Sequence, residues 1–513
     1  MARQQDLWQL AQSRRTQHVF STIITAQSVE RDLSSEDGLR DALDWCRRTG
    51  VTKVYIESFR DGLWAKREIL VRARSRFQEA GIAASGCVTT TRMAKSSEGG
   101  WAMFPCFTNA ATQQQLQDVF EFTAPLFDEI MIDDFYCTEC ECAECQAARG
   151  DRSWAAYRLG LMRRLSVERV LEPVRRVNPG ATVIIKYPQW YDHFPERGYD
   201  PDGETTLFDR TWVGTETRDV DDERWGGCAA YRAFWIMRWL GQSGGEKCGG
   251  GWYDPYGTHE DSYLEQARQT ILGGARESVL FCYPSLRQDT GPANIEALRR
   301  ELPALLDLAA WVEGETPRGV VSYKPIGSIA EGERYIFDWL GMVGLPVVPA
   351  HEFPAHASVA VFAADSAHDP RFAGSAADFL SHGGTALFTE RAAAVAEPGE
   401  SPAAFVFSPP ENLCQFPDLP ADQIAALREA ALTPLGLQLD GPTGVALYLF
   451  GDRKLALENF DDEPAELRLA APHADQYRIA LALGHEGATA SAHHGQVAAM
   501  VPPRALICLE RPG

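Results

Sequence analysis

Short apolar runs alternate with amphipathic runs along the first three hundred residues. In 36–49, Leu39, Ala42, Leu43 and Cys46 recur at helical spacing, which predicts a helix with one buried face. Eight such strand–helix repeats predict a (β/α)8 TIM barrel over residues 1–316. No G-x-G-x-x-G motif follows the first strand, which weakens the doubly wound alternative. The predicted strands are 20–25, 52–57, 82–88, 128–134, 181–187, 211–215, 249–253 and 278–283; the other predicted helices are 66–80, 113–123, 153–177, 222–240, 262–272 and 295–312.

The pattern changes twice after the predicted barrel. Residues 314–319 have the composition of a linker. Strand-like and helix-like runs then alternate on a smaller scale, which predicts an open α/β domain over 317–440. From 441 onward, short strands separated by turn residues predict a small antiparallel β domain over 441–513. The predicted elements are strands 320–323, 358–363 and 385–389 with helices 334–342 and 371–381, and then strands 446–450, 454–460, 465–469, 477–482 and 505–509.

Composition and charge restrict the kind of protein. The 513 residues are 45% hydrophobic and 23% charged, which is typical of globular proteins with two or three domains. A formal net charge of -22 argues against nucleic acid and anionic membranes as partners. The first residues lack a secretory apolar segment and no run is long enough to span a bilayer. We therefore expect a cytoplasmic protein whose 12 cysteines are thiols or metal ligands.

Acidic residues stand at the C-terminal ends of several predicted barrel strands, where an α/β barrel places its active site. Aromatic residues lie between them, and carboxylates beside aromatic rings suit the hydroxyls and apolar faces of sugars. Glycosidic cleavage needs two carboxyl groups. The pattern predicts a glycoside hydrolase for small glycosides or oligosaccharides, although a strand-end carboxylate can also cap a helix or order a loop. The carboxylates are Glu57, Asp133, Asp134, Glu216 and Asp254, and the aromatic residues include Tyr187, Trp190, Trp212 and Trp252.

Asp133 and Asp134 are adjacent, so their side chains would point to opposite faces of the strand. We favour Asp134 as the one that faces the barrel mouth, and expect Asp133 to bond backbone amides or a neighbouring strand.

Four cysteines follow at once, at Cys137, Cys140, Cys142 and Cys145. Thiolates at this density favour tetrahedral zinc in a structural role, and reduced thiols without a metal are the alternative.

The chain resembles the family 42 β-galactosidases of the glycoside hydrolases. The resemblance implies a barrel, a trimerisation domain shaped like a class I glutamine amidotransferase, a C-terminal β domain and a homotrimer. It also implies that zinc is bound by Cys106, Cys140, Cys142 and Cys145, with Cys137 left over. The residues that carry it are 106–109 (CFTN), 132–136 (IDDFY), Cys140-x-Cys142-x-x-Cys145, 345–349 (LPVVP), 358–363 (SVAVFA) and 382–388 (HGGTALF).

The chain departs from this family at the catalytic positions. The family ends its fourth strand with Asn-Glu, where this chain has Asp134-Phe135, and its seventh-strand nucleophile is Glu, where Asp254 is the nearest carboxylate. Barrel glycosidases acting on α-linkages instead place an Asp nucleophile after strand four and the acid/base after strand six. Asp134 and Glu216 match that arrangement, so we assign Asp134 as nucleophile or base and Glu216 as acid/base. Substrate binding is assigned to Glu57, Asp133, Tyr187, Trp190, Trp212, Arg218, Trp252 and Asp254.

Two alternatives remain. One is a β-galactosidase that uses Asp254 as its nucleophile. The other is a non-catalytic carbohydrate-binding protein on a glycosidase scaffold, which Phe135 in the acid position motivates.

Overall fold

The computed structural model describes residues 6–512, which form two compact units. The first holds residues up to Glu216 together with Ser243–Tyr256 and Ala275–Leu306. The second holds Thr217–Gln242, Gly257–Gly274 and the chain from Asp307 onward. No helix among the described residues is both long enough and apolar enough to cross a bilayer.

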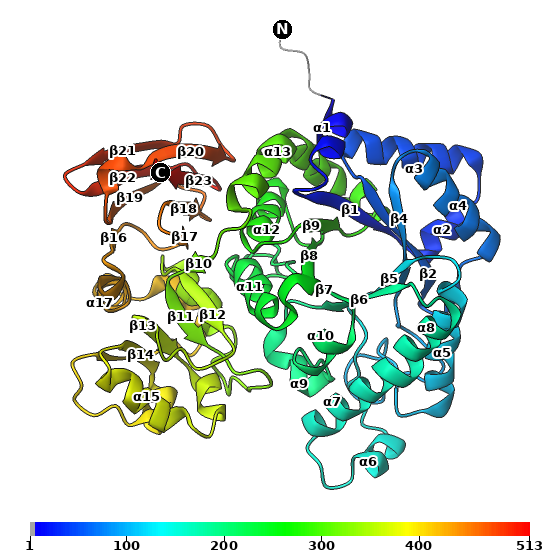
Figure 1. The fold of residues 1–513 in the computed structure, drawn as a ribbon, viewed down its shortest axis with the longest axis horizontal. Helices are drawn as coiled ribbons and strands as arrows, with labels where there is room; N and C mark the ends of the chain where they lie inside the picture. The colour runs from blue at the N-terminus through cyan, green and yellow to red at the C-terminus, as the bar shows by residue number, and fades with distance from the viewer. Residues whose placement is uncertain (1–5, 513) are drawn as a thin grey trace. The chain divides into compact units, whose positions relative to one another are not determined.

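The first unit contains the predicted barrel (Figure 1). Its strands are parallel to their neighbours, and the sheet closes because the first strand pairs with both the second and the last. A short strand, β3 (Leu63–Trp64), pairs antiparallel with the end of β2. The eight barrel strands are β1 (Val19–Ile24), β2 (Lys53–Arg60), β4 (Ala83–Val88), β5 (Glu129–Ile132), β6 (Thr182–Tyr187), β7 (Arg210–Gly214), β8 (Cys248–Tyr253) and β9 (Glu277–Leu280).

Helices follow these strands as the alternation predicts. In α3, the Ser35 side chain accepts the N–H of Gly38, and Gly50 ends the helix in the left-handed conformation with φ of 72°. The face with Leu39 and Leu43 is buried, so the apolar spacing identified the helix correctly. The helices are α1 (Leu7–Ser13), α2 (Ala26–Asp32), α3 (Glu36–Thr49), α4 (Arg67–Glu79), α5 (Ala110–Thr123), α6 (Ala143–Arg149), α7 (Trp154–Leu165), α8 (Glu172–Val177), α9 (Phe194–Arg197), α10 (Gly203–Leu207), α11 (Arg232–Gly244), α12 (Glu260–Leu272) and α13 (Gly291–Val312).

The barrel interior is layered. One side chain from each strand forms a buried middle layer: Ile23, Tyr55, Cys87, Met131, Ile184, Trp212, Trp252 and Val279. Side chains two positions apart on a strand share a face, so the next residues on that face lie one layer nearer the C-terminal mouth. The polar members of this upper layer are buried: Glu57, Thr89, Asp133, Lys186 and Asp254. Gly214 and Phe281 are the members from β7 and β9, and Glu216 follows β7 two residues later.

Two predicted helices of the barrel region differ from the structure. The helix predicted at 222–240 begins only at Arg232, because the Asp222 carboxylate accepts the N–H groups of Arg224 and Trp225 and forms a turn. The helix predicted at 153–177 is interrupted by a π-helical segment, Ser166–Leu171, between α7 and α8.

The second unit contains the two C-terminal folds. A parallel sheet in the order β12-β11-β13-β14-β15 is the predicted open α/β domain, and two antiparallel sheets make up the β domain. The parallel sheet and its helices are β11 (Val320–Tyr323), α14 (Ile336–Met342), β12 (Val347–Ala350), β13 (Val359–Phe362), α15 (Phe372–Ser381), β14 (Thr385–Thr389), α16 (Glu390–Ala396), β15 (Ala404–Phe407) and α17 (Ala421–Leu432). The antiparallel strands are β10 (Pro317–Arg318), β16 (Gln438–Asp440), β17 (Val445–Phe450), β18 (Lys454–Asn459), β19 (Ala465–Ala470), β20 (Arg478–Leu483), β21 (Thr489–His493), β22 (Gln496–Val501) and β23 (Leu506–Glu510).

The predicted linker at 314–319 is partly structured. Its residues Pro317 and Arg318 form β10, which pairs antiparallel with β17 of the C-terminal fold. Proline is tolerated there because β10 lies at the edge of its sheet. The linker prediction was therefore wrong for these two residues.

Candidate active site

The upper layer of the barrel is built around Asp133. Its carboxylate is bonded by the Lys186 ammonium from β6 and lies 2.5 Å from an Arg60 guanidinium nitrogen. The Thr89 hydroxyl, which has one proton to donate, lies 3.0 Å from Asp133 Oδ2 and 2.5 Å from Glu57 Oε1. Burial alone would raise the pKa of Asp133, but the Lys186 and Arg60 charges hold it well below its usual range. Asp133 is therefore a fixed anion.

Glu57 is enclosed in the same network. Both of its oxygens lie 2.9 Å from Arg60 Nε, and the N–H of Ala26 donates at 2.8 Å. Glu57 and Asp133 have no exposed surface. This does not fit the expectation that they bind sugar hydroxyls, because protein donors already occupy their oxygens. Asp133 lies on the inward face with Met131, contrary to the expectation that Asp134 is the one of the pair that faces the barrel interior. The expectation that Asp133 bonds a neighbouring strand agrees with its contact to Lys186.

Asp134 has a different environment although it is the next residue. Its side chain is 14% exposed, and its nearest cation is Lys186, with 4.0 Å between Nζ and Oδ1. Its backbone carbonyl accepts the Tyr199 hydroxyl, which fixes the turn after β5. Burial, followed by the negative charge of Asp133, raises the pKa of Asp134 to about 7. Asp134 can therefore gain or lose a proton near neutral pH.

Glu216 and Asp254 follow the sixth and seventh barrel strands and are buried, at 4% and 5% exposure. Gly214 leaves room for the Glu216 carboxylate: a β-carbon there would lie 2.7 Å from its Oε2 and 2.7 Å from Gln189 N. Glu216 thus leans toward the end of the fifth strand, which neighbours the strand before Asp134. The N–H of Tyr256 donates to Asp254 at 3.2 Å.

The predicted aromatic residues fall into different places. The Trp252 ring lies 3.8 Å from Lys186 Nζ, a cation–π contact directly beside the carboxylates. Trp190 is partly exposed, with the Arg197 guanidinium 4.2 Å from its ring. Trp212 packs in the apolar middle layer. Tyr187 follows the inward Lys186, so it points out of the barrel, where its hydroxyl donates to the Asp200 carbonyl at 3.3 Å.

Trp212 and Tyr187 are therefore too deeply packed for the substrate contacts expected of them. Arg218 belongs to the second unit. There its N–H donates to Gln266 at 3.3 Å, and its guanidinium lies 5.1 Å from the Trp225 ring.

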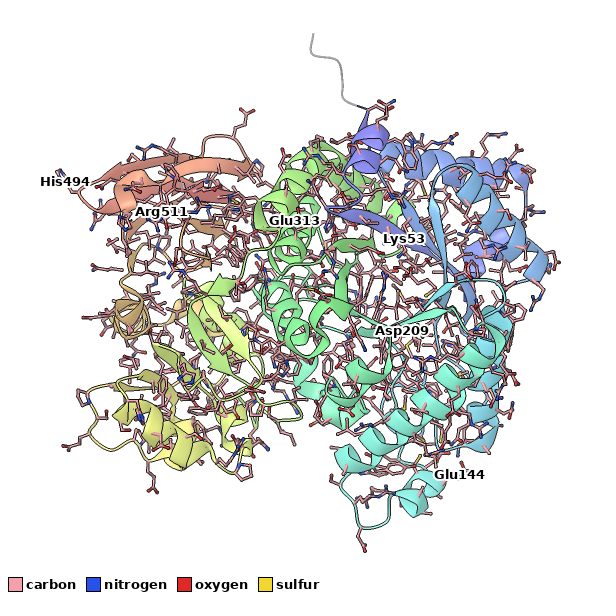
Figure 2. All side chains as sticks on the ribbon, in the orientation of Figure 1. Lys53, Glu144, Asp209, Glu313, His494 and Arg511 are labelled. Atoms are coloured by element: carbon pink, nitrogen blue, oxygen red, sulfur yellow. The ribbon has the colours of Figure 1, made fainter. Side chains whose placement is uncertain are left out.

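Four cysteine sulfurs gather beside the loop that follows β5. Cys106, Cys140, Cys142 and Cys145 are buried, and their Sγ atoms all lie within 4.8 Å of one another. The separations from Cys106 are 3.8 Å to Cys142 and 3.6 Å to Cys145, and Cys142 lies 3.7 Å from Cys145. Cys137 is buried outside this group. Glu144, labelled in Figure 2, lies next to the group on α6, paired with Lys95 at 3.4 Å.

The sequence analysis did not identify three residues of this region: Lys186 and Arg60, which bind the buried carboxylates, and Trp101, which is exposed. Lys186 interrupts the apolar run Thr182–Tyr187 at an inward position, and an ionisable residue there was a readable signal. Arg60 stands three residues after Glu57, a spacing that carries no such signal. Trp101 is 50% exposed on the loop between β4 and α5, where sequence gives no side-chain direction.

The family comparison agrees with this architecture. A family described as "Probable glycosyl hydrolase, catalytic domain" matches residues 4–298. The chain belongs to this family. The matched segment contains the barrel strands, Asp134, Glu216, Asp254 and the four cysteines.

An uncharacterized protein of Saccharolobus solfataricus is 23% identical over 354 residues. That alignment covers 61% of this chain, and the chain spans only 57% of the length of that relative.

Solved structures share the fold over nearly the whole chain. An α-L-fucosidase isoenzyme 2 from Paenibacillus thiaminolyticus superposes with a TM-score of 0.65 at 12% identity, covering 97% of this chain and 100% of its own. A β-galactosidase from Bacillus circulans sp. alkalophilus also reaches 0.65 at 12% identity, covering 96% and 99%. Gan42B, a GH42 β-galactosidase from G. stearothermophilus, reaches 0.63 at 11%, covering 96% and 98%. The fold is therefore GH42-like, as the sequence resemblance implies.

Proposed function

We propose that this protein is a glycosidase that hydrolyses small glycosides or oligosaccharides with Asp134 and Glu216 as its two carboxyl groups. Membership of a glycosyl hydrolase family and the acidic C-terminal mouth of the barrel support the reaction class. The observation that carries the proposal is the partly exposed Asp134 carboxyl, whose pKa is raised to about 7 beside a permanently charged Asp133.

The protonation state of Asp134 near neutral pH favours the role of general acid/base for this residue. An acid catalyst must hold a proton at working pH, whereas a nucleophile must be ionised. The two causes of the raised pKa of Asp134, burial and the Asp133 charge, both favour the protonated form of this carboxyl. We therefore assign proton donation to Asp134 and the nucleophile or base role to Glu216, the reverse of the sequence-based assignment. The position of the Glu216 carboxylate, near the end of the fifth strand, supports this pairing.

Asp254 is the alternative partner for Asp134. It directly follows the seventh strand and is buried, as Glu216 is. The two candidates predict different kinetic behaviour for Glu216→Gln and Asp254→Asn, so both variants belong in the same experiment.

Mutation with leaving groups of different quality tests the assignment. Asp134→Asn should lower kcat/KM for alkyl glycosides by about 10²–10⁴ but much less for dinitrophenyl glycosides, which leave without a proton. The variant of the true nucleophile should lose activity on both substrates. Asp41→Asn, an exposed carboxylate on α3, is the matched control. Equal losses on both substrates for Asp134→Asn would remove it as the acid.

The structural neighbours suggest which sugars to try first. Their names are β-galactosidase and α-L-fucosidase, so aryl β-D-galactosides and aryl α-L-fucosides form the first panel. Sugar binding without turnover across both anomeric series would favour the non-catalytic alternative.

We further propose a structural zinc ion in the cysteine group. Four sulfurs about 2.3 Å from a central ion lie about 3.8 Å apart at the corners of a tetrahedron. The separations among Cys106, Cys142 and Cys145, 3.6–3.8 Å, fit that geometry, and the Cys140 sulfur lies within 4.8 Å of each of them. Cys106, Cys140, Cys142 and Cys145 would hold the ion, which would fix the loops before α5 and after β5.

A homotrimer through residues 317–440 is also proposed, on the GH42-like architecture. Light scattering of the purified chain should give three times the monomer mass.

A further inference from the structure

Among the described residues, Trp101 has the highest exposure of the large apolar side chains at the surface, with half of its area open to solvent. An exposed ring that continues into a larger aromatic group, as Trp101 does with Phe104 and Phe135, is a candidate binding surface. The residue lies on the loop between β4 and α5, which follows the third barrel strand and belongs to the C-terminal mouth.

The ring stands one side chain away from the proposed acid. Its centroid lies 5.9 Å from that of Phe135, edge to face at 77°, and Phe135 directly follows Asp134. On its other side it meets Phe104 at 5.5 Å and 90°. Phe104 and Phe135 lie 5.9 Å apart. The three rings form one aromatic group beside Asp134, of which Trp101 is the exposed member.

The backbone under Trp101 is held firmly. Its N–H donates to the Glu139 carboxylate at 3.0 Å, and Arg197 holds the other Glu139 oxygen at 2.5 Å. Gly100 has φ of 65°, and a β-carbon there would lie 2.3 Å from that carboxylate. Glycine is therefore required for this close approach. A fixed backbone with an exposed ring gives a preorganised platform, which reduces the entropy lost on binding.

A cavity of about 470 Å³ adjoins this platform at Gly100. Its size lies within the range of small-molecule sites. The lining combines the Trp154 ring with charged and polar side chains: His193 and Glu196 are 2.9 Å apart, and the Arg197 guanidinium lies 5.9 Å from the ring of Phe104, a member of the aromatic group. Such walls offer donors and acceptors to hydroxyls.

We propose that Trp101 and this cavity form the aglycone subsite of the enzyme, which binds the leaving sugar of a disaccharide or longer oligosaccharide. The proposal rests on the glycosidase function above. The leaving ring places its apolar C–H face on Trp101 and its hydroxyls toward His193, Glu196 and Arg197. As the Glu216 carboxylate, or a water that it deprotonates, forms a bond to the anomeric carbon, the bond from that carbon to the glycosidic oxygen breaks. The Asp134 proton passes to that oxygen, so the leaving sugar departs as a neutral alcohol.

Substrates that do and do not reach the cavity test the subsite. Lactose and 2′-fucosyllactose have a sugar leaving group, whereas β-D-galactosyl fluoride and α-L-fucosyl fluoride release only fluoride. On whichever pair the wild type cleaves, Trp101→Ala should lower kcat/KM for the oligosaccharide about threefold to tenfold, as expected for a lost stacking contact. The glycosyl fluoride should react as in the wild type. Trp101→Phe should recover part of the loss.

Two controls keep the outcomes distinct. Trp8→Ala, a partly exposed tryptophan on α1, should leave both substrates unchanged. Trp101→Ala should unfold cooperatively like the wild type, with at most a small loss of melting temperature from the two ring contacts, because the hydrogen bond to Glu139 comes from the backbone. Equal rates of wild type and Trp101→Ala on the oligosaccharide, or equal losses on both substrates, would overturn the subsite while leaving the glycosidase function intact.

If the wild type cleaves neither pair, galactosides and fucosides are excluded as substrates, and the subsite is tested by binding instead. Calorimetric titration of wild type with lactose and 2′-fucosyllactose should then show binding that Trp101→Ala weakens. Absence of binding, or equal affinity of the two proteins, would overturn the subsite as well.

Discussion

Asp133 and Asp134 are neighbours in sequence, yet their pKa values move in opposite directions. Asp133 faces two cations, whereas Asp134 faces the Asp133 charge with Lys186 4.0 Å away. The pattern is a known way to obtain a charged and a protonatable carboxylate in one site. Once Lys186 and Arg60 fix the charge on Asp133, a second charge on Asp134 becomes unfavourable near neutral pH.

This arrangement predicts the pH dependence of the reaction. Asp134 holds its proton below pH of about 7, so kcat/KM should fall about tenfold per pH unit above that value. Asp133→Asn removes the charge that disfavours ionised Asp134 and leaves Lys186 to pair with it. The basic limb of the kcat/KM profile should therefore move to lower pH in this variant.

The profile is measured with an alkyl glycoside, and thermal melting at each pH excludes unfolding as the cause. A basic limb that does not move in Asp133→Asn would contradict the coupling between the two aspartates.

Sequence could identify the acidic residues but not their surroundings. The run that ends in Asp133 and Asp134 pointed to the right strand end. Which of the two carries a fixed charge depends on Arg60 and Lys186, which come from other strands. Glu57 looked equally available in the sequence, and only packing shows that it is enclosed.

At the scale of elements, a buried histidine bridges the two strands that close the barrel. His18 directly precedes β1, and its ring nitrogens lie 3.1 Å from the Ala275 carbonyl and 3.0 Å from the Ser278 hydroxyl at the start of β9. It therefore connects the first and last strands of the barrel. Burial lowers the pKa of His18 to about 4, although the Ala275 carbonyl opposes this shift.

The shift predicts a pH-dependent stability. The folded-state pKa is below the unfolded value of 6.5, so the unfolded chain binds the proton more tightly. The stability that neutral, buried His18 contributes is fully present above pH 6.5. It is lost as the pH falls toward 4, and the free energy of unfolding decreases by about 3 kcal/mol in all. His18→Gln should remove this slope from denaturant unfolding, whereas His356→Gln, an exposed histidine, should keep it. Parallel slopes in wild type and His18→Gln would refute the linkage.

The loops around the cysteine group provide the second prediction at this scale. If zinc is bound as proposed, the purified chain should contain one zinc per chain by elemental analysis. Cys106→Ser should lose the metal and melt at lower temperature, because the ion would connect two loops distant in sequence. Cys137→Ser is the matched control, since this buried cysteine lies outside the group. Equal metal content in both variants would contradict the ligand set.

Element prediction succeeded where the sequence pattern itself decides the structure. The strand at Thr385–Thr389 and the helix at Glu36–Thr49 were identified to the residue, because each has a clear period and a terminating residue. The helix predicted from 222 failed because the Asp222 turn competes locally. Cys106 lies far from the other three cysteines in sequence, so spacing alone could not group it with them.

At the scale of the whole molecule, two barrel-type helices belong to the second unit. In α11, Trp235 donates to the Ser322 hydroxyl at 2.9 Å on β11, and Arg232 binds Asp338 on α14. In α12, Glu265 lies 3.3 Å from Arg504. The alternation of strands and helices predicted these helices but not their partners. Boundaries drawn from pattern changes at 316 and 440 therefore differ from the compact units of the structure.

The Arg232–Asp338 pair predicts how strongly the second unit depends on these contacts. The two side chains are 3% and 0% exposed, with 2.7 Å between Nε and Oδ2, and the guanidinium also lies 3.7 Å from the Tyr335 ring. Asp338→Asn would leave a buried cation without its counter-charge, which costs about 3–5 kcal/mol. Amide hydrogen exchange in α11 and α14 should accelerate accordingly. Asp452→Asn, which removes an 85% exposed carboxylate 4.0 Å from Arg318, should change exchange little. Adding Arg232→Met to Asp338→Asn should recover part of the protection, because the stranded charge is then gone; a double variant no better protected than Asp338→Asn would argue against this electrostatic explanation.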